Sequence, residues 1–234
     1  MALLTLPIRD VRVETPRTRS VFVSLSGAVV DYCAGQAVWV GGHGQRLRKP
    51  YSIACAPEQA RIQEALELLI RVGADGSAGP HLDPPAAGML IDVDGPTGTF
   101  CFPDNPREPR FLFIAGGTGI APLRAMLWHA LWAFPDRELA LFYSARSADG
   151  FAYGDELRQL ARAGRVALRE TVTREAGPPW TGARGRLTPA RIASMLTPEP
   201  TRCFVCGPPA FAEDITSWLR DLGVAEERVL AEGW

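Results

Sequence analysis

The hydrophobic pattern of residues 107–234 constrains the fold more than any other feature of the chain. Short apolar runs alternate there with longer stretches whose apolar residues recur at helical spacing. Such alternation is typical of an α/β domain built on a doubly wound, five-stranded parallel sheet. We expect the strands at residues 111–115, 139–144, 166–172, 202–206 and 228–230, and helices at residues 122–134, 153–162, 188–195 and 209–222.

Residues 1–106 have a different pattern, in which short strand-like runs are separated by glycine, proline and aspartate. Runs of this length and spacing predict a small antiparallel β-barrel. Residues 64–71 also have helical spacing, and we expect a strand there. The proline-rich segment 103–109 is the most linker-like part of the chain, so we expect the domain boundary between residues 106 and 107. The strand-like runs are residues 21–25, 38–40, 51–53, 66–72 and 89–93.

A glycine-rich turn follows the first predicted strand of the second domain. It reads Gly116-Gly-Thr-Gly-Ile-Ala-Pro122, and an amphipathic stretch comes directly after it. Glycine admits positive φ and the close approach of a ligand, and proline suits the first turn of a helix. Free amides at the start of a helix attract phosphate, so the turn predicts an anion site. A tight connection without a ligand would read the same, and Pro122 replaces the last glycine of the usual dinucleotide fingerprint.

The segment Arg48-Lys49-Pro50-Tyr51-Ser52 combines two cations, a tyrosine and a serine on one predicted strand. A tyrosine ring can lie against another flat ring, a lysine can neutralise a phosphate, and a serine hydroxyl can hydrogen-bond a ring nitrogen. The segment therefore predicts a site for a phosphorylated aromatic ligand. A solvated strand edge would have the same composition.

Three further segments carry weaker signals. Gly76-Ser-Ala-Gly-Pro-His-Leu82 is a glycine-rich loop with a helix expected to start at Pro80, and its amides suit a phosphate, although a plain loop would look the same. Cys206-Gly-Pro-Pro209 follows a predicted strand, and we expect Cys206 to be exposed at the carboxyl edge of the sheet. The chain ends in Glu232-Gly-Trp234, where a tryptophan is usually a packing residue but an indole can also cover a ring.

Charge and composition exclude several classes of function. The formal net charge of −1 favours neither a nucleic-acid nor a membrane partner. No apolar run approaches the ~18 residues of a spanning helix, and the first residues lack the basic start of a signal peptide, so we expect a cytoplasmic protein. The 5 cysteines are scattered, which argues against a disulfide framework. Cys203 and Cys206 match C-x-x-C, but on a strand they point to opposite faces, so we expect no metal site. His43, His81 and His129 are expected to be structural or surface residues.

Taken in order, the five segments at residues 48–53, 76–82, 116–123, 206–208 and 232–234 resemble motifs of the ferredoxin–NADP(H) reductase superfamily. The resemblance covers nearly the whole chain. It implies a FAD-binding β-barrel over residues 1–106 and an NAD(P)-binding α/β domain over residues 107–234, without an iron–sulfur domain.

The resemblance also implies roles for residues of the barrel. Tyr51 would lie against the flavin with Ser52 near flavin N5, and Lys49 would take the place of an arginine, with Arg48 as a neighbouring cation. Gly79 stands where the family often has a serine, which leaves backbone amides to serve the FAD phosphates. The residues expected to bind FAD are Arg48, Lys49, Pro50, Tyr51, Ser52, Gly76, Ser77, Ala78 and Gly79.

In the second domain the resemblance implies a site for the nicotinamide dinucleotide. Cys206 would border the nicotinamide, Glu232 would lie beside the flavin, and Trp234 would stack on the isoalloxazine and move before hydride transfer. Ser52, Cys206, Glu232 and Trp234 are therefore the expected catalytic residues. The expected nucleotide-binding residues are Gly117, Thr118, Gly119, Pro122, Cys206, Gly207, Pro208 and Trp234.

Arginines that follow the second and third strands of this domain favour NADP(H) over NAD(H). Arg146, Arg174, Arg184 and Arg186 stand where some family members hold the 2′-phosphate, although solvated loop arginines would look the same. The resemblance implies a FAD-dependent oxidoreductase that transfers a hydride between NAD(P)H and flavin and exchanges electrons with a separate carrier such as ferredoxin or flavodoxin. A free-flavin reductase and an electron-transfer subunit of a larger complex are the alternatives.

Overall fold

The computed structural model describes residues 3–174 and 179–233. By its contacts the chain divides into two compact units. The barrel unit consists of Met1–Phe102 with Arg124–His129, and the α/β unit consists of Pro103–Leu123 with Ala130–Trp234.

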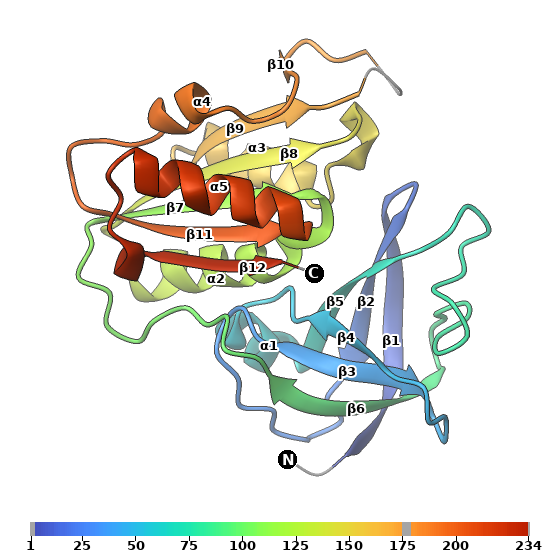
Figure 1. Ribbon diagram of the computed structural model, residues 1–234. Helices are drawn as coiled ribbons and strands as arrows, with labels where there is room; N and C mark the ends of the chain where they lie inside the picture. Colours follow the sequence, from blue (N-terminus) through green and yellow to red (C-terminus); the bar gives the residue numbers. More distant parts are fainter. Residues whose placement is uncertain (1–2, 175–178, 234) are drawn as a thin grey trace. The chain divides into compact units, whose positions relative to one another are not determined.

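The barrel unit is built on a sheet whose neighbouring strands are antiparallel, in the order β4-β3-β6-β1-β2-β5 (Figure 1). An antiparallel bridge between Ile53 and Leu68 joins the β4 end of this order to β5, so the sheet closes on itself. The predicted antiparallel barrel is thereby confirmed. Its elements are β1 Leu4–Thr15, β2 Thr18–Ser24, β3 Ala37–Gly42, β4 Lys49–Ser52, α1 Pro57–Gln63, β5 Ala65–Arg71 and β6 Leu90–Thr97.

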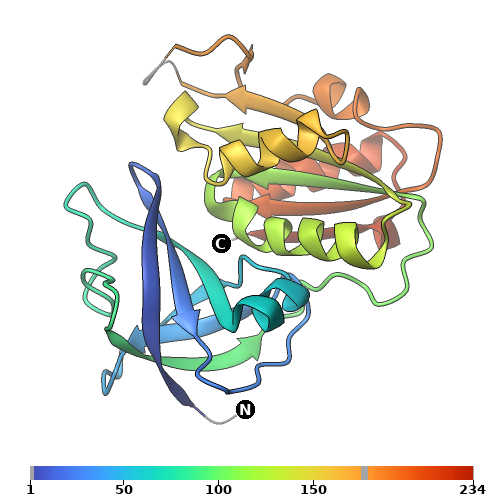
Figure 2. The same ribbon diagram turned by 180° about the vertical axis from the view of Figure 1, so that it is seen from behind.

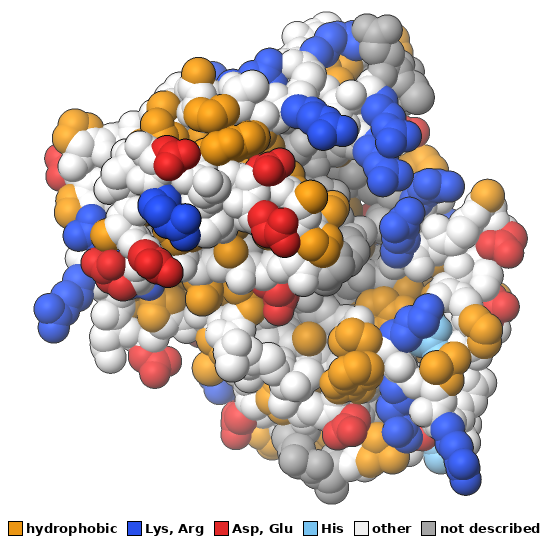
Figure 3. All heavy atoms as spheres, viewed as in Figure 1, with side chains coloured by type: hydrophobic (Ala, Val, Ile, Leu, Met, Phe, Trp, Pro, Cys, Tyr) orange, Lys and Arg blue, Asp and Glu red, His pale blue; other side chains and the backbone are white. Residues whose placement is uncertain are grey.

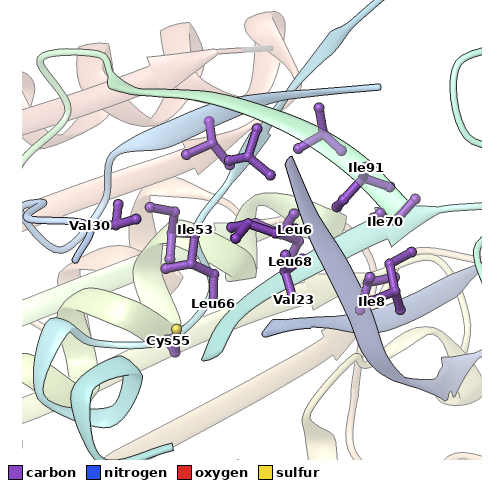
Figure 4. Packing of buried hydrophobic residues seen from close by; sticks show 14 of the residues in the cluster. Leu6, Ile8, Val23, Val30, Ile53, Cys55, Leu66, Leu68, Ile70 and Ile91 are labelled. Atoms are coloured by element: carbon purple, nitrogen blue, oxygen red, sulfur yellow. The ribbon is translucent and has the colours of Figure 1, made fainter. Parts of the chain in front are cut away.

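The core of the barrel comes from alternate residues of these strands. Leu66, Leu68 and Ile70 of β5 are fully buried, and in Figure 4 Leu66 lies beside Ile53, Leu68 near Val23 and Ile70 beside Ile91. The core cluster takes every second residue of β5, which is the spacing of a strand and not of a helix. The expected strand over residues 66–72 is therefore confirmed, and the helical spacing of residues 64–71 does not give a helix.

Two elements of the barrel unit were not expected, and one expected element does not form. Strand β1 was missed because register shifts, between Ile8 and Asp10 and again near its end, interrupt its alternation. Helix α1 was also missed, although Pro57 occupies its first turn. The expectation of a helix from Pro80 was wrong, because the chain makes a turn there in which the Leu82 amide donates to the Gly79 carbonyl at 2.9 Å.

The α/β unit is a parallel sheet in the order β10-β9-β8-β7-β11-β12, with α4 and α5 on one face and α2 and α3 on the other (Figures 1 and 2). This confirms the predicted doubly wound fold. A sixth strand, β10, was missed because it has only two residues. The strands are β7 Arg110–Gly116, β8 Glu138–Ala145, β9 Ala167–Val172, β10 Ala183–Arg184, β11 Thr201–Gly207 and β12 Val229–Gly233. The helices are α2 Ile120–Ala133, α3 Gly154–Arg162, α4 Pro189–Ala193 and α5 Pro209–Asp221, with short 3₁₀ helices at Gly117–Gly119, Ala148–Gly150 and Glu226–Arg228.

The order of these strands places a switch point in the sheet. The chain runs outward from β7 to β10 and then returns to β11 on the other side of β7. In open sheets of this type, ligands bind beyond the carboxyl ends of the two strands at the switch point. Those ends lead into the 3₁₀ helix Gly117–Gly119 and into Pro208.

No helix among the described residues is both long enough and apolar enough to cross a membrane.

Candidate functional site

Strand β4 brings Lys49 and Tyr51 together on one face. Successive side chains of a strand alternate between its faces, so Lys49 and Tyr51 share a face that Pro50 and Ser52 do not. Pairing with β3 fixes the register, with Lys49 opposite Val40 and Tyr51 opposite Val38. Lys49 is exposed and Tyr51 is half-buried against the barrel core. The predicted pair of a cation and an aromatic ring is therefore present on one surface.

Tyr51 is held by His81, a residue for which the sequence suggested no role beyond structure. The Tyr51 hydroxyl lies 2.6 Å from His81 Nε2, and the two rings stack with centroids 5.8 Å apart. Burial raises the pKa of Tyr51 to about 12, so its hydroxyl keeps its proton. Burial, together with the charge of Lys49, lowers the pKa of His81, which favours the neutral imidazole. In the sequence, the one sign that His81 belongs to the candidate site was its place inside the glycine-rich segment 76–82.

The glycine-rich loop uses many of its amides internally. The amides of Gly76, Ser77 and Gly79 donate to the Gly73 carbonyl, to Asp75 Oδ1 and to Ser77 Oγ, at 3.0–3.1 Å. Gly79 has φ +99°, a conformation that disfavours the serine common in the family. These three amides are satisfied within the loop, so a ligand there would depend more on nearby side chains. Ala78, also expected to bind FAD, is half-buried and packs against the barrel core.

Two side-chain nitrogen atoms lie close to Gly79. A Cβ built on Gly79 would lie 3.7 Å from Lys49 Nζ and 3.7 Å from His81 Nδ1. Lys49 forms no ion pair with any residue that the structure describes. An exposed cation of this kind suits an anionic group such as a phosphate.

Arg48 is directed toward a different partner from Lys49. Its Nη2 lies 3.5 Å from Oδ2 of the buried Asp92, which also accepts hydrogen bonds from Thr5 and the Gly44 amide and contacts His43 Nδ1 at 2.9 Å. Burial alone would raise the pKa of Asp92, but these hydrogen bonds lower it to about 2. Arg48 is therefore directed toward Asp92 of β6, and its predicted contact with FAD stays a prediction.

In the α/β unit, the glycines of the turn that follows β7 differ in what surrounds them. A Cβ on Gly119 would lie 2.2 Å from the Cys206 carbonyl oxygen, and Cβ atoms on Gly116 and Gly207 would lie 3.1 and 2.7 Å from the ring of Phe211. These three glycines allow β7, β11 and α5 to approach closely. Gly117 differs, because it has φ +58° and open space around it.

The open part of the turn faces the switch point of the sheet. Gly117 is exposed and Thr118 is half-buried, while Pro122 lies in the first turn of α2 as expected. Of the predicted nucleotide-binding residues in this turn, Gly117 and Thr118 are thus the ones accessible to a ligand. Pro208, at the neighbouring strand end, is also exposed.

Cys206 lies at the predicted strand end, but the expectation that it is exposed was wrong. Its exposure is 0%. The backbone of Gly119 packs directly on its carbonyl, and β11 pairs it with Ala115 on one side and Glu232 on the other. Glu232 is half-buried, and burial raises the pKa of its carboxyl group. Trp234 lies outside the described residues.

Arg146 and Arg174 are adjacent at the carboxyl ends of β8 and β9. The Arg174 amide donates to the Arg146 carbonyl at 2.9 Å, and both side chains are exposed. Arg184 instead donates to the Trp180 carbonyl at 3.0 Å, and Arg186 is exposed beyond β10. Figure 3 shows basic side chains gathered over this part of the α/β unit. Among the described residues, no group of three or more His, Cys, Asp or Glu side chains is arranged to hold a metal ion.

The barrel with its tyrosine and lysine face, and the parallel sheet with its glycine turn, define a flavin- and nicotinamide-dependent oxidoreductase of two domains. Comparison with known families agrees: an oxidoreductase FAD-binding domain matches residues 8–102, and an oxidoreductase NAD-binding domain matches residues 113–217. The chain belongs to the ferredoxin–NADP(H) reductase-like flavoprotein superfamily. The exposed Lys49, on the same face of β4 as Tyr51, fits the anionic part of FAD.

Relatives of the chain are reductases with different partners in their names. Cytochrome b5 reductase 4 of Xenopus tropicalis is 28% identical over 200 residues, covering 80% of this chain and 38% of that protein. Ferredoxin–NADP reductase B of Sorangium cellulosum (strain So ce56) is 29% identical over 196 residues, covering 81% and 79%. The crystal structure of Amycolatopsis cytochrome P450 reductase GcoB is 26% identical with a TM-score of 0.85, covering 99% and 70%. The chain thus spans well under half of the cytochrome b5 reductase 4 it matches.

Proposed function

We propose that this oxidoreductase transfers a hydride between NADPH and the flavin of a tightly bound FAD, and exchanges electrons with a separate one-electron carrier such as ferredoxin or flavodoxin. The open turn at Gly117 and Thr118 carries the proposal, because it lies at the switch point where sheets of this class bind nucleotides. The names of its relatives, which pair reductase with ferredoxin, cytochrome b5 or cytochrome P450, support an electron carrier as partner.

The residues of the barrel unit would bind and orient the cofactor. FAD supplies the redox-active ring, and the protein contributes position and electrostatics. Tyr51, fixed by its hydrogen bond to His81, offers a ring face to the isoalloxazine, and Lys49 offers a positive charge to the phosphates. Ser52, on the other face of β4, is proposed to lie near flavin N5 as the family pattern implies.

The residues of the α/β unit would bind the nicotinamide nucleotide and control protons. The exposed Gly117 amide and half-buried Thr118 would contact the nucleotide, and the close packing of Gly119 on Cys206 would fix the neighbouring strand end. Glu232 holds a proton more readily than an exposed glutamate, because burial raises its pKa. Cys206, Glu232 and Trp234 stay proposed catalytic residues beside the nicotinamide and the flavin.

The preference for NADPH is proposed from Arg146 and Arg174. Their backbones are joined by a hydrogen bond, so two exposed guanidinium groups start from neighbouring positions. Each hydrogen bond from a charged donor to a phosphate contributes about 1.5–3 kcal/mol, enough to separate NADPH from NADH. Arg186 would add a third charge from the far side of β10.

Purification and a steady-state assay test the proposal. The protein should be yellow as isolated, and should reduce ferricyanide with NADPH without added flavin. A colourless protein that consumes NADPH only when flavin is added would contradict it and identify a free-flavin reductase. Failure to oxidise either nucleotide, with flavin bound, would indicate an electron-transfer subunit.

A further inference from the structure

Arg191 of helix α4 uses its guanidinium group to hold one short segment of the α/β unit. Its Nη1 donates to the Gly185 and Arg186 carbonyls, both at 3.3 Å, and its Nη2 donates to the Arg184 carbonyl at 2.6 Å. Hydrogen bonds from a charged donor are stronger than those between neutral groups. One side chain therefore fixes three consecutive carbonyls of residues 184–188, the β10–α4 loop.

The buried Thr171 of β9 holds the same loop from the sheet. Its hydroxyl donates to the Gly185 carbonyl at 2.8 Å and accepts from Arg191 Nη1 at 3.2 Å. The Gly185 amide donates to the Val172 carbonyl at 2.8 Å, and Gly185 has φ +93°, a conformation that favours glycine. Thr171 and Arg191 thus hold the backbone of the loop from two sides.

The β10–α4 loop carries Arg186 at the edge of the sheet where ligands bind to folds of this class. Strand β10 pairs in parallel with Thr171 and Val172, the last two residues of β9, so the loop continues beyond the carboxyl end of β9 (Figure 1). Arg186 is exposed, and its side chain forms no ion pair with any residue that the structure describes. Its carbonyl is held by Arg191, whereas its guanidinium group is accessible to a ligand.

We propose that Arg191 is a positioning residue that strengthens the preference for NADPH by holding the loop that carries Arg186. This inference rests on the proposed function, in which Arg186 is one of the charges that recognise the 2′-phosphate. An arginine on a loose loop loses conformational entropy when it binds a phosphate. Because Arg191 holds the backbone in advance, less entropy is lost when NADPH binds. NADH has no 2′-phosphate, so its binding gains nothing from this contact.

Two substitutions separate the charge of Arg191 from the geometry of its guanidinium group. Arg191→Lys keeps the positive charge but has no planar fork to hold several carbonyls, and Arg191→Met removes both. Arg220→Met is the control, because it removes a charge from an exposed position of α5, which lies on the same face of the sheet as α4 (Figure 1).

The experiment is the steady-state oxidation of NADPH and of NADH by the flavin-loaded full chain. We expect Arg191→Lys and Arg191→Met each to raise the KM for NADPH about fivefold, with kcat and the KM for NADH within about twofold of the wild type. Arg220→Met should change none of these values.

Two further measurements connect the kinetics to the loop. The amide of Gly185 should exchange with deuterium faster in both Arg191 variants than in the wild type, because the loop has lost its anchor. In an Arg186→Gln background, Arg191→Met should raise the KM for NADPH by less than about twofold, because the two residues act through one contact.

The outcomes distinguish the inference from the function on which it rests. A wild-type KM for NADPH in Arg191→Lys would assign the effect to charge, and an equal rise for NADPH and NADH would assign it to general damage of the fold. Either result, or faster exchange at Gly185 with an unchanged preference, would overturn the inference and leave the proposed function standing. A wild-type protein that oxidises NADH as readily as NADPH would overturn the proposed preference and the inference with it.

Discussion

The glycine-rich turns of the two units look alike in sequence and work differently in the structure. In the α/β unit the glycines at 116, 119 and 207 are required by packing, because a side chain would meet Phe211 or the Cys206 carbonyl. In the barrel unit Gly76 and Gly79 are required by positive φ, and their amides are satisfied inside the loop. The first turn has an exposed backbone at Gly117, whereas the second uses its amides within the loop.

The difference shows that a glycine pattern alone does not say which atoms bind a phosphate. At Gly117 the backbone is exposed at the start of a helix, which is the usual arrangement for an anion. At Gly79 the nearby cation is Lys49, whose side chain comes from β4 and not from the loop. We therefore expect a backbone site for phosphate in the α/β unit and a side-chain site in the barrel unit, from similar glycine-rich sequences.

The largest expected effect is on stability, from Gly119→Ala. The new Cβ would lie 2.2 Å from the Cys206 carbonyl oxygen and would push β11 away from the turn, at a cost of about 3 kcal/mol. Gly117→Ala is the matched control, because it meets no atom and costs only about 1 kcal/mol for its positive φ. Urea unfolding of both variants measures the difference, and equal losses would show that packing does not distinguish the two glycines.

The next effect concerns nucleotide choice in the α/β unit. Arg146→Ala or Arg174→Ala should raise the Kd for NADPH about tenfold or more and leave the Kd for NADH within about twofold. Arg162→Ala removes the same charge from an exposed position at the end of α3 and should change neither value. Isothermal titration with both nucleotides provides the readout. If the binding of NADPH and of NADH weakened equally, the two arginines would attract both nucleotides and would not select NADPH.

The smallest effect appears only in acid, and it concerns the hydrogen bonds around Asp92 in the barrel unit. The pKa of Asp92 lies at about 2 in the folded chain and near its usual 3.8 in the unfolded chain. Between these values the unfolded chain binds more protons, so stability present above pH 3.8 is lost as the pH falls toward 2. The Asp92→Asn protein should have a lower free energy of unfolding than the wild type at neutral pH. Its free energy of unfolding should also fall less than that of the wild type when the pH is lowered. Urea midpoints across this range measure both, and parallel pH profiles for the two proteins would contradict the assignment.

Much of the fold was predictable because its signals are local. Alternating apolar runs at residues 111–115 and 139–144 need no tertiary information to be identified as strands. Strand β1 escaped because two register shifts interrupt its alternation, and β10 escaped because two residues carry no pattern. Sequence periodicity detects regular elements and fails where the backbone departs from regularity.

The candidate site was predictable in its motifs and not in its contacts. Lys49 and Tyr51 are two residues apart on one strand, so their common face follows from the sequence. Tyr51 and His81 are separated by 30 positions, and their hydrogen bond exists only after the barrel unit has folded. Cys206 is likewise buried in a strand that pairs with β7 and β12, and the sequence around Cys206 does not encode that pairing.

An anaerobic titration of the purified protein, followed by visible absorbance, tests the central claim most directly. If the chain is a FAD-dependent NADPH oxidoreductase, the flavin absorbance should bleach with about one equivalent of NADPH, because the bound FAD takes up the hydride. The same bleaching with NADH should require a large excess. A flavin spectrum that stays unchanged with both nucleotides would contradict the account.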